Sequence, residues 1–225
     1  MKRTGKASGL DRAASDDSET QWSRLAARYL RKEFALSKEV KRATVHIAGM
    51  GLYELFINGQ RIGDQVLAPA PTDYRKTILY NTYDVTPQLR KENAIGVTLG
   101  NGRFYTMRQN YKPYKIPTFG YPKLRLNLIV EYMDGSKETI ATNTSWKLTT
   151  EGAIRSNNEY DGEEYDARKE LGNWTQSGYD DKSWIAAQRV SIPSGTLRAQ
   201  IMPGMKVMDT CLLYTSPSPR DLSTS

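Results

Sequence analysis

Residues 123–132 read Lys123-Leu124-Arg125-Leu126-Asn127-Leu128-Ile129-Val130-Glu131-Tyr132 and alternate between apolar and mostly polar side chains. Successive side chains of a strand point to opposite faces, so the apolar residues share one face and the polar residues the other. Asp134-Gly135 follows, a dipeptide typical of a tight hairpin turn, and residues 136–141 are expected to return as the partner strand. The stretch predicts an antiparallel hairpin with one buried face.

Other short segments extend this pattern along the chain. Asn58-Gly59 predicts a second hairpin, between strands at 53–57 and 60–62. No long stretch keeps a helical period, and only residues 86–89 predict a short helical turn, with Thr86 as its cap. Further strands are expected over residues 43–47, 77–80, 93–99 and 145–149. Many short strands with frequent turn signals predict an all-β fold, an antiparallel β-sandwich of jelly-roll-like form.

The tryptophans are expected to serve this sandwich. Trp146 alternates with Leu148 and is predicted to lie in the core. The stretch Asp180-Asp181-Lys182-Ser183-Trp184 predicts a terminal turn whose tryptophan packs back on the sandwich, whereas Trp174 fits either surface.

The composition excludes several classes of function. The chain has 225 residues, with 32 Lys and Arg against 25 Asp and Glu, a net charge of +7. The cations are spread over strands and turns rather than gathered in one stripe, which favours a solvated surface over nucleic-acid binding. Attraction to an acidic polysaccharide such as pectin is compatible with the charge. No window approaches the roughly 18 apolar residues of a membrane span, so we expect neither a nucleic-acid nor a membrane partner.

The two ends of the chain differ in composition from the middle. Residues 1–21 are rich in Ser, Asp, Lys and Arg and predict a disordered or linker segment, with no signal peptide. Residues 211–225 resemble the translation of a sequencing adapter and are expected to be a non-native tail. The folded domain is therefore expected over residues 22–210. The residues leave the location of the protein open; a longer parent protein is expected in the periplasm or outside the cell.

Classical catalytic groups are scarce. His46 is the only histidine and stands between two core-facing strand residues, so we expect a structural or surface role. The only cysteine, Cys211, falls in the expected tail. A His/Cys metal site or a Ser-His-Asp triad is therefore nearly excluded.

Residues 158–168 place five carboxylates and two tyrosines around Gly162. Unpaired charges of this density would be costly in an apolar core, so the run is either a solvated functional loop or a paired polar network at a sheet edge. We expect the network Asp161, Glu163, Asp166 and Arg168 to tie a loop to the sheet. A carboxylate pair within residues 161–166 that cleaves glycosides is the less favoured alternative.

Several motifs resemble one family in order along the chain. Besides residues 158–168, they are Gly49 to Asp64, Thr72-Asp73-Tyr74, Tyr83-Asp84-Val85-Thr86 and Leu99 to Tyr105. This set is similar to the N-terminal β-sandwich domain of bacterial α-L-rhamnosidases of glycoside hydrolase family 78, over about residues 27–209. The resemblance implies a fold of the galactose-binding or carbohydrate-binding-module type. It also implies a truncated fragment of a parent whose inverting acid and base lie in a separate (α/α)₆ barrel, so that the fragment itself is not an enzyme.

Sugar binding is the favoured function of the loops. Aromatic faces and a few placed polar groups hold sugars, and loops at one end of a sandwich suit this task. The candidate carbohydrate-binding residues are Asp73, Tyr74, Asn101, Arg103, Tyr105, Tyr111, Asn158 and Tyr160. Such a cluster could hold Ca²⁺ through oxygen ligands, and the resemblance allows it.

The chain is therefore expected to be a non-catalytic accessory domain that assists recognition of rhamnose-containing glycans and packs on the catalytic domain of its parent. A purely structural spacer without sugar affinity is the alternative.

Overall fold

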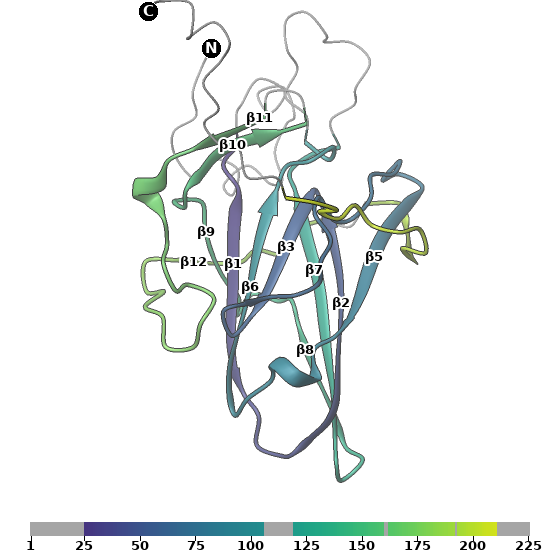
Figure 1. Cartoon of the computed structure of the whole chain (residues 1–225), viewed down its shortest axis with the longest axis vertical. Coiled ribbons are helices and arrows are strands. Elements are labelled where there is room, and N and C mark those ends of the chain that lie inside the picture. The colour runs from purple at the N-terminus through teal and green to yellow at the C-terminus, as the bar shows by residue number, and fades with distance from the viewer. Residues whose placement is uncertain (1–24, 106–118, 160–161, 192, 211–225) are drawn as a thin grey trace, which may run out of the picture.

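The computed structural model of the protein describes residues 25–105, 119–159, 162–191 and 193–210, which form a β-sandwich of two packed sheets (Figure 1). The expected segments 1–21 and 211–225 lie outside the described residues. The all-β prediction is confirmed: the described helical structure is confined to two 3₁₀ turns, η2 (Thr86–Gln88) and η3 (Ala167–Lys169). No helix in this part of the chain has the length and apolar character to cross a membrane.

The first sheet has six strands in the order β12-β9-β1-β6-β3-β4. Its strands are β1 (Arg28–Ala35), β3 (Leu52–Ile57), β4 (Gln60–Arg61), β6 (Glu92–Gly100), β9 (Lys147–Thr149) and β12 (Ile185–Ala186). All their pairings are antiparallel, with Leu30 opposite Val97 and Leu148, and Leu55 opposite Val97. These apolar residues therefore form rows across one face of the sheet.

The second sheet has five strands in the order β13-β5-β2-β7-β8. Its strands are β2 (Val40–Met50), β5 (Thr77–Asp84), β7 (Lys123–Tyr132), β8 (Lys137–Ala141) and β13 (Thr196–Ala199). Only β13 runs parallel to its neighbour, β5. A separate antiparallel hairpin, β10 (Ile154–Asn158) with β11 (Gly162–Tyr165), lies across one end of the sandwich (Figure 1).

The core lies between the two sheets, as the alternation of β7 predicts. Leu126, Leu128 and Val130 are fully buried there and pack with residues of β2, β3 and β6. Trp146 is also fully buried in this core, which confirms its prediction. Burial of large apolar side chains contributes about 1.5–3 kcal/mol each, so the sandwich is held mainly by this layer.

The two predicted hairpins are confirmed. Asn58 and Gly59 both have positive φ angles, 52° and 83°, as a two-residue turn between β3 and β4 requires. Gly135 has φ 83° in the turn between β7 and β8. The cap predicted for the 3₁₀ turn at residues 86–88 is wrong: the side chain of Thr86 does not cap it, and Asp84 accepts hydrogen bonds from the Thr86 backbone N–H and hydroxyl instead.

A second apolar cluster covers the outer face of the six-stranded sheet. Tyr29 in β1 packs edge-to-face on Trp174, and Trp174 packs in turn on Trp184. Trp184 therefore packs back on the sandwich as predicted, and Trp174 lies beside it. The segment that carries both tryptophans closes this face of the sheet from solvent.

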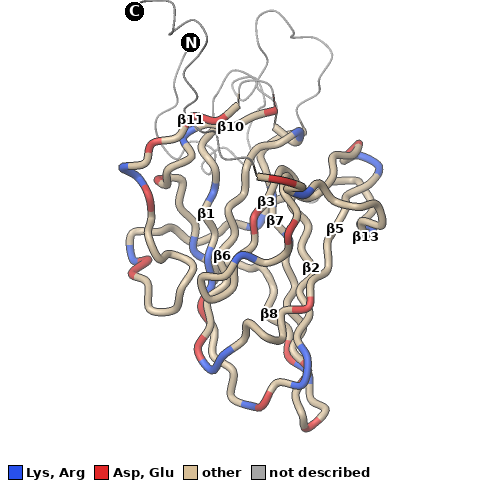
Figure 2. Tube along the Cα trace, in the orientation of Figure 1, with Lys and Arg blue, Asp and Glu red and all other residues tan. Residues whose placement is uncertain are grey.

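Charges of both signs alternate over the described surface. Figure 2 shows Lys and Arg interspersed with Asp and Glu along strands and turns. Examples are the ion pairs Lys38–Asp134, Lys137–Glu131 and Lys206–Asp64. This mixing accords with the solvated surface that the sequence predicts.

Candidate functional site

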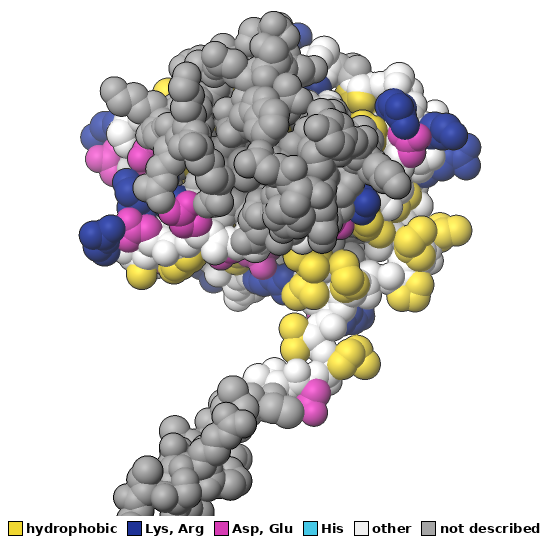
Figure 3. Space-filling view, turned by 90° about the horizontal axis from the view of Figure 1, so that it is seen from above, with side chains coloured by type: hydrophobic (Ala, Val, Ile, Leu, Met, Phe, Trp, Pro, Cys, Tyr) yellow, Lys and Arg dark blue, Asp and Glu magenta, His cyan; other side chains and the backbone are white. Residues whose placement is uncertain are grey.

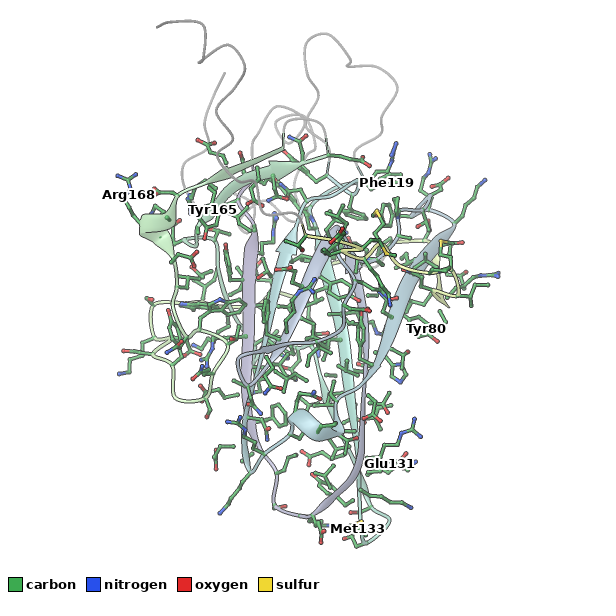
Figure 4. All side chains as sticks on the ribbon, in the orientation of Figure 1. Tyr80, Phe119, Glu131, Met133, Tyr165 and Arg168 are labelled. Atoms are coloured by element: carbon green, nitrogen blue, oxygen red, sulfur yellow. The ribbon has the colours of Figure 1, made fainter. Side chains whose placement is uncertain are left out.

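The six predicted carbohydrate-binding residues that the structure describes gather at the end of the sandwich that carries the β10–β11 hairpin. We call this end the rim; it consists of residues 72–76, 100–105, 119–123 and 157–159. Ring contacts join its first three segments, and hydrogen bonds join residues 100–105 to the hairpin. Figure 4 shows Phe119 at this end of the molecule. Tyr165 and Arg168 lie at the same end, on the opposite side from Phe119.

A tight turn after β6 begins the rim. Gly100 ends the strand and Gly102 has a φ of 48°, so the chain turns tightly at Gly100-Asn101-Gly102. Gly51 crosses this turn so closely that an added Cβ would lie 2.2 Å from the carbonyl oxygen of Gly100. Glycines are needed because two backbones touch at this point.

Asn101 ties the turn to three other segments. Its backbone N–H donates to Asn157 Oδ1 at 2.7 Å, and its side-chain amide donates to the carbonyls of Leu25 and Asn157, both at 2.8 Å. Its own Oδ1 accepts from the Arg28 guanidinium at 3.3 Å. Asn101 is fully buried, so these bonds satisfy a polar side chain in the interior and fix the hairpin to the six-stranded sheet.

Aromatic rings form the floor of the rim. Tyr74 meets Phe104 and Phe119 at centroid distances of 5.0 and 5.2 Å, and Phe104 stacks on Phe119. Burial raises the pKa of Tyr74 to about 12. Tyr105 stacks on Tyr121 in a neighbouring cluster. These contacts give the floor the close packing of a small core.

Polar groups stand above this floor. Asp73 accepts two hydrogen bonds from the Arg75 guanidinium, at 2.9 and 3.1 Å, and this partner lowers the pKa of the carboxyl. Arg103 reaches across to Glu159 at 3.4 Å, with both side chains 39% exposed. Asn158 lies half-buried at the end of β10. These side chains present anionic, cationic and amide groups at the surface.

The structure divides the eight predicted carbohydrate-binding residues by depth. Tyr74, Asn101 and Tyr105 are buried and serve as packing and hydrogen-bonding supports, because their burial leaves almost no surface for a sugar. Asp73, Arg103 and Asn158 are half-buried and reach the surface in part. Tyr111 and Tyr160 lie outside the described residues.

Sequence reasoning missed two charged residues that shape the rim. Arg75 holds Asp73 and also lies over the Phe119 ring, at 5.7 Å from its centroid, and Glu159 holds Arg103. The Asp-X-Arg spacing of residues 73–75 was a signal for the first pair. No local sequence pattern indicates the second pair, Arg103 with Glu159, because its members lie 56 positions apart.

The expected polar network has a more local form than predicted. Asp166 caps the 3₁₀ turn η3, accepting from the Arg168 backbone N–H and pairing with its guanidinium at 2.8 and 2.9 Å. This pair stays within three residues of chain and does not reach the sheet. Glu163 is exposed in β11, opposite Asn157, and Asp161 lies outside the described residues.

The geometry does not favour the carboxylate-pair alternative. The Arg168 guanidinium lowers the pKa of Asp166, whereas the general acid of a glycosidase needs a raised value. Among the described residues there is also no group of three or more His, Cys, Asp or Glu side chains placed to hold a metal ion.

Comparison with known proteins assigns the family. The sequence profile described as the alpha-L-rhamnosidase N-terminal domain matches residues 38–209. The chain belongs to this family. An alpha-L-rhamnosidase of Formosa agariphila is 42% identical over 186 residues, which are 80% of this chain and 19% of that protein. A Streptomyces avermitilis alpha-L-rhamnosidase is 40% identical over 175 residues, 74% of this chain and 17% of that protein.

Solved structures agree with this assignment for the rhamnosidase domain. An alpha-L-rhamnosidase from Dictyoglumus thermophilum superposes with a TM-score of 0.75 at 45% identity, over 82% of this chain and 20% of that one. The Streptomyces avermitilis alpha-L-rhamnosidase complexed with L-rhamnose gives a TM-score of 0.75 at 37% identity, over 83% and 18%. The chain thus spans about a fifth of the length of these relatives.

Proposed function

We propose that this rhamnosidase domain is a non-catalytic accessory domain whose rim assists recognition of rhamnose-containing glycans and which packs on the catalytic domain of its parent. In this proposal the parent hydrolyses α-L-rhamnosides by inversion, with its acid and base outside the chain. The complex of the Streptomyces avermitilis relative with L-rhamnose makes rhamnose the first sugar to test.

One observation carries the proposal: partly exposed polar groups stand on a closely packed, buried floor at the rim. Asp73 and Arg103 are fixed by their ion-pair partners, and the floor below them is the packed cluster around Tyr74 and Phe104. Groups held in advance lose little conformational entropy when they bind a ligand. A carboxylate and a guanidinium so placed can accept from and donate to sugar hydroxyls.

The test is a calorimetric titration of the 225-residue chain with L-rhamnose and with D-glucose, in calcium and then in a chelator. We expect heat that saturates with rhamnose and not with glucose. Loss of that heat in the chelator would add a bound metal ion, which the described side chains alone do not specify.

Two matched variants assign the binding to the rim. Asp73→Asn removes a carboxylate from an ion pair at the rim, and Asp134→Asn removes one from the Lys38 pair at the opposite end. We expect the first to weaken rhamnose binding about tenfold, the loss of one charge-assisted hydrogen bond, and the second to leave it unchanged. A flat titration of the folded protein, or equal effects of the two variants, would refute recognition at the rim.

A second function, packing on the rest of the parent, has its own observation. Ile201, Val207 and Met208 are 93, 66 and 90% exposed, and Met202 and Met205 lie between them about half exposed. Figure 3 shows hydrophobic side chains along the chain that leaves the molecule in this view. Such a strip is typical of a contact surface, and about four-fifths of the length of the relatives lies outside the shared part.

Mixing experiments test the packing role. The chain is combined with the Dictyoglumus thermophilum relative from which the shared domain has been deleted, and complex formation is followed by size-exclusion chromatography. We expect a complex that is lost in the variant Ile201→Ser/Met208→Ser. If the purely structural spacer is correct, this complex forms while the rhamnose titration stays flat.

A further inference from the structure

A cavity of about 700 Å³ lies on the outer face of the five-stranded sheet, the face turned away from the core. At the edge of the sheet the cavity extends inward between the two sheets. It exists because β8 is shorter than β7. The β7–β8 pairing ends at Asn127 opposite Ala141, whereas β7 continues to Lys123 along β2. The edge of β7 beyond Leu126 therefore lacks a strand beside it in the described part of the chain.

A connecting segment covers this gap. The strap, residues 187–191 and 193–195, leaves β12 in one sheet and joins β13 in the other. Its ends are fixed by hydrogen bonds from the backbone N–H of Ala187 to the Trp146 carbonyl and from that of Thr196 to the Lys76 carbonyl, at 2.8 and 2.9 Å. Between these two ends the strap passes over the outward side chains of β7. The strap and these side chains both line the cavity.

The charged side chains that line this strap cleft are all cationic. Arg28, Lys123, Arg125 and Arg189 line it, and none of the described lining residues is Asp or Glu. Arg125 and Arg189 are exposed at its mouth. The rest of the molecule interleaves charges of both signs, so this local excess of cations is distinctive.

Arg28 is the deepest of these cations. Its side chain is almost fully buried, at 3% exposure, and its recorded partners are Asn101 Oδ1 and the face of the Tyr121 ring. Burial lowers the pKa of its guanidinium to about 10, so it remains charged at neutral pH. Arg31, the other buried arginine of β1, has two carboxylate partners instead. Arg28 has no carboxylate partner among the described residues. A buried guanidinium in that state is costly, and an anion in the cleft would offset that cost.

The remaining lining is apolar and aromatic. Met50, Ile78 and Leu148 contribute aliphatic surface, and Tyr121 and Trp146 contribute rings. A second hollow of about 250 Å³ adjoins it and shares Arg125 and Asn127. The labelled Tyr80 of β5, which lines this second hollow with His46, lies on the outer side of the sheet in Figure 4. The two hollows together lie within the size range of small-molecule sites.

We propose that the strap cleft binds a carboxylate-bearing sugar, that is, a uronate unit of a glycan. The carboxylate pairs with the guanidinium groups, which match its two oxygens. The pyranose ring packs on the aliphatic and aromatic lining, as sugar C–H faces do. This site shares residues 121–123 with the rim but uses neither Asp73 nor Arg103, and it does not depend on rhamnose recognition there.

The test is a titration of the full chain with D-glucuronate, D-glucose and inorganic phosphate at low and at physiological salt. We expect saturable binding of glucuronate and none of glucose, and phosphate should bind at least about tenfold more weakly because it cannot use the apolar lining. Equal binding of glucose, or of phosphate, would overturn the proposal for a uronate. So would a flat glucuronate titration of the folded protein.

Variants separate the cleft from the rim and from general charge. Arg125→Ala/Arg189→Ala removes two exposed cations of the cleft, and Arg42→Ala removes an exposed arginine near the far end of β2 in the same sheet. We expect the double variant to weaken glucuronate binding at least about tenfold, with Arg42→Ala and Asp73→Asn unchanged. If Arg42→Ala weakens binding as much as the double variant, nonspecific charge attraction explains the binding and the cleft does not.

Discussion

Arg31 in β1 and Asp181, 150 residues later in the chain, form an ion pair against the outer face of the six-stranded sheet. The Arg31 side chain is 1% exposed. It also bonds Glu33 and the carbonyls of Trp174 and Gln176. One guanidinium thereby holds the segment whose two tryptophans cover that face.

Removal of this guanidinium should loosen the whole covering segment. We expect Arg31→Ala to lower the free energy of unfolding by about 3 kcal/mol, because it leaves Asp181 and the carbonyls of Trp174, Gln176 and Tyr179 without their donor. Urea denaturation followed by tryptophan fluorescence measures the loss. Arg168→Ala is the matched control, since it breaks an ion pair whose arginine is 89% exposed, and it should cost less than about 0.5 kcal/mol. Equal costs would contradict the bracing role of Arg31.

The Asn101 network predicts a local effect. Asn101→Ala strands the carbonyl of Asn157 and removes the bond to Arg28, so we expect a loss of about 2–3 kcal/mol of stability. Amide hydrogen exchange should quicken most in β10 and β11. Asn143→Ala breaks only an exposed turn around Ser145 and serves as the control. Unchanged protection of the hairpin in Asn101→Ala would show that Asn101 does not fix it.

Two glycines with positive φ test the crossing of backbones at the rim. Gly51→Ala places a methyl group against the Gly100 carbonyl, and we expect it to cost more than about 3 kcal/mol. Gly135 has a similar sign of φ, but an added Cβ would meet nothing within 4 Å. Gly135→Ala should therefore cost only about 1–2 kcal/mol. Thermal unfolding ranks the two variants, and a reversed ranking would contradict the close approach.

Much of the sandwich could be predicted because the residue pattern of a strand indicates which of its faces is buried. The alternation in β7 and the Asn58-Gly59 turn are local signals, and both are present in the structure as expected. The covering of an outer face is not local. Arg31 stands on the polar side of β1, and only the distant segment at Trp174 makes that side an interior.

The rim shows the same limit at the level of a site. Tyr74, Asn101 and Tyr105 have the residue types of a sugar-binding loop, but packing against other segments of the chain buries their side chains. The cations of the strap cleft could not be predicted as a site because their local pattern is that of an ordinary solvent-facing strand. Lys123 and Arg125 alternate as solvent-facing residues should, and the strap that turns their face into a cleft comes more than 60 positions later.

A hydrogen-bonded pair of tyrosines, one buried and one partly buried, predicts a weakness at alkaline pH. The Tyr53 and Tyr83 hydroxyls lie 3.2 Å apart, and Asn81 donates to Tyr53 at 2.8 Å. Burial raises the pKa of both phenols above the ordinary value near 10. Below pH 10 both states of the protein keep these protons. Above it the unfolded chain ionises first, so stability is lost as the pH rises toward the folded-state values.

The variant Tyr53→Phe isolates this contribution. Each tyrosine that ionises only in the unfolded chain removes about 1.4 kcal/mol of stability per pH unit. We therefore expect Tyr53→Phe to be about 1 kcal/mol less stable than the wild type at pH 8, through its lost hydrogen bond, and to lose stability less steeply between pH 10 and 11. Urea denaturation at these pH values measures both slopes. Parallel curves would mean that Tyr53 ionises as readily in the folded protein as in the unfolded chain.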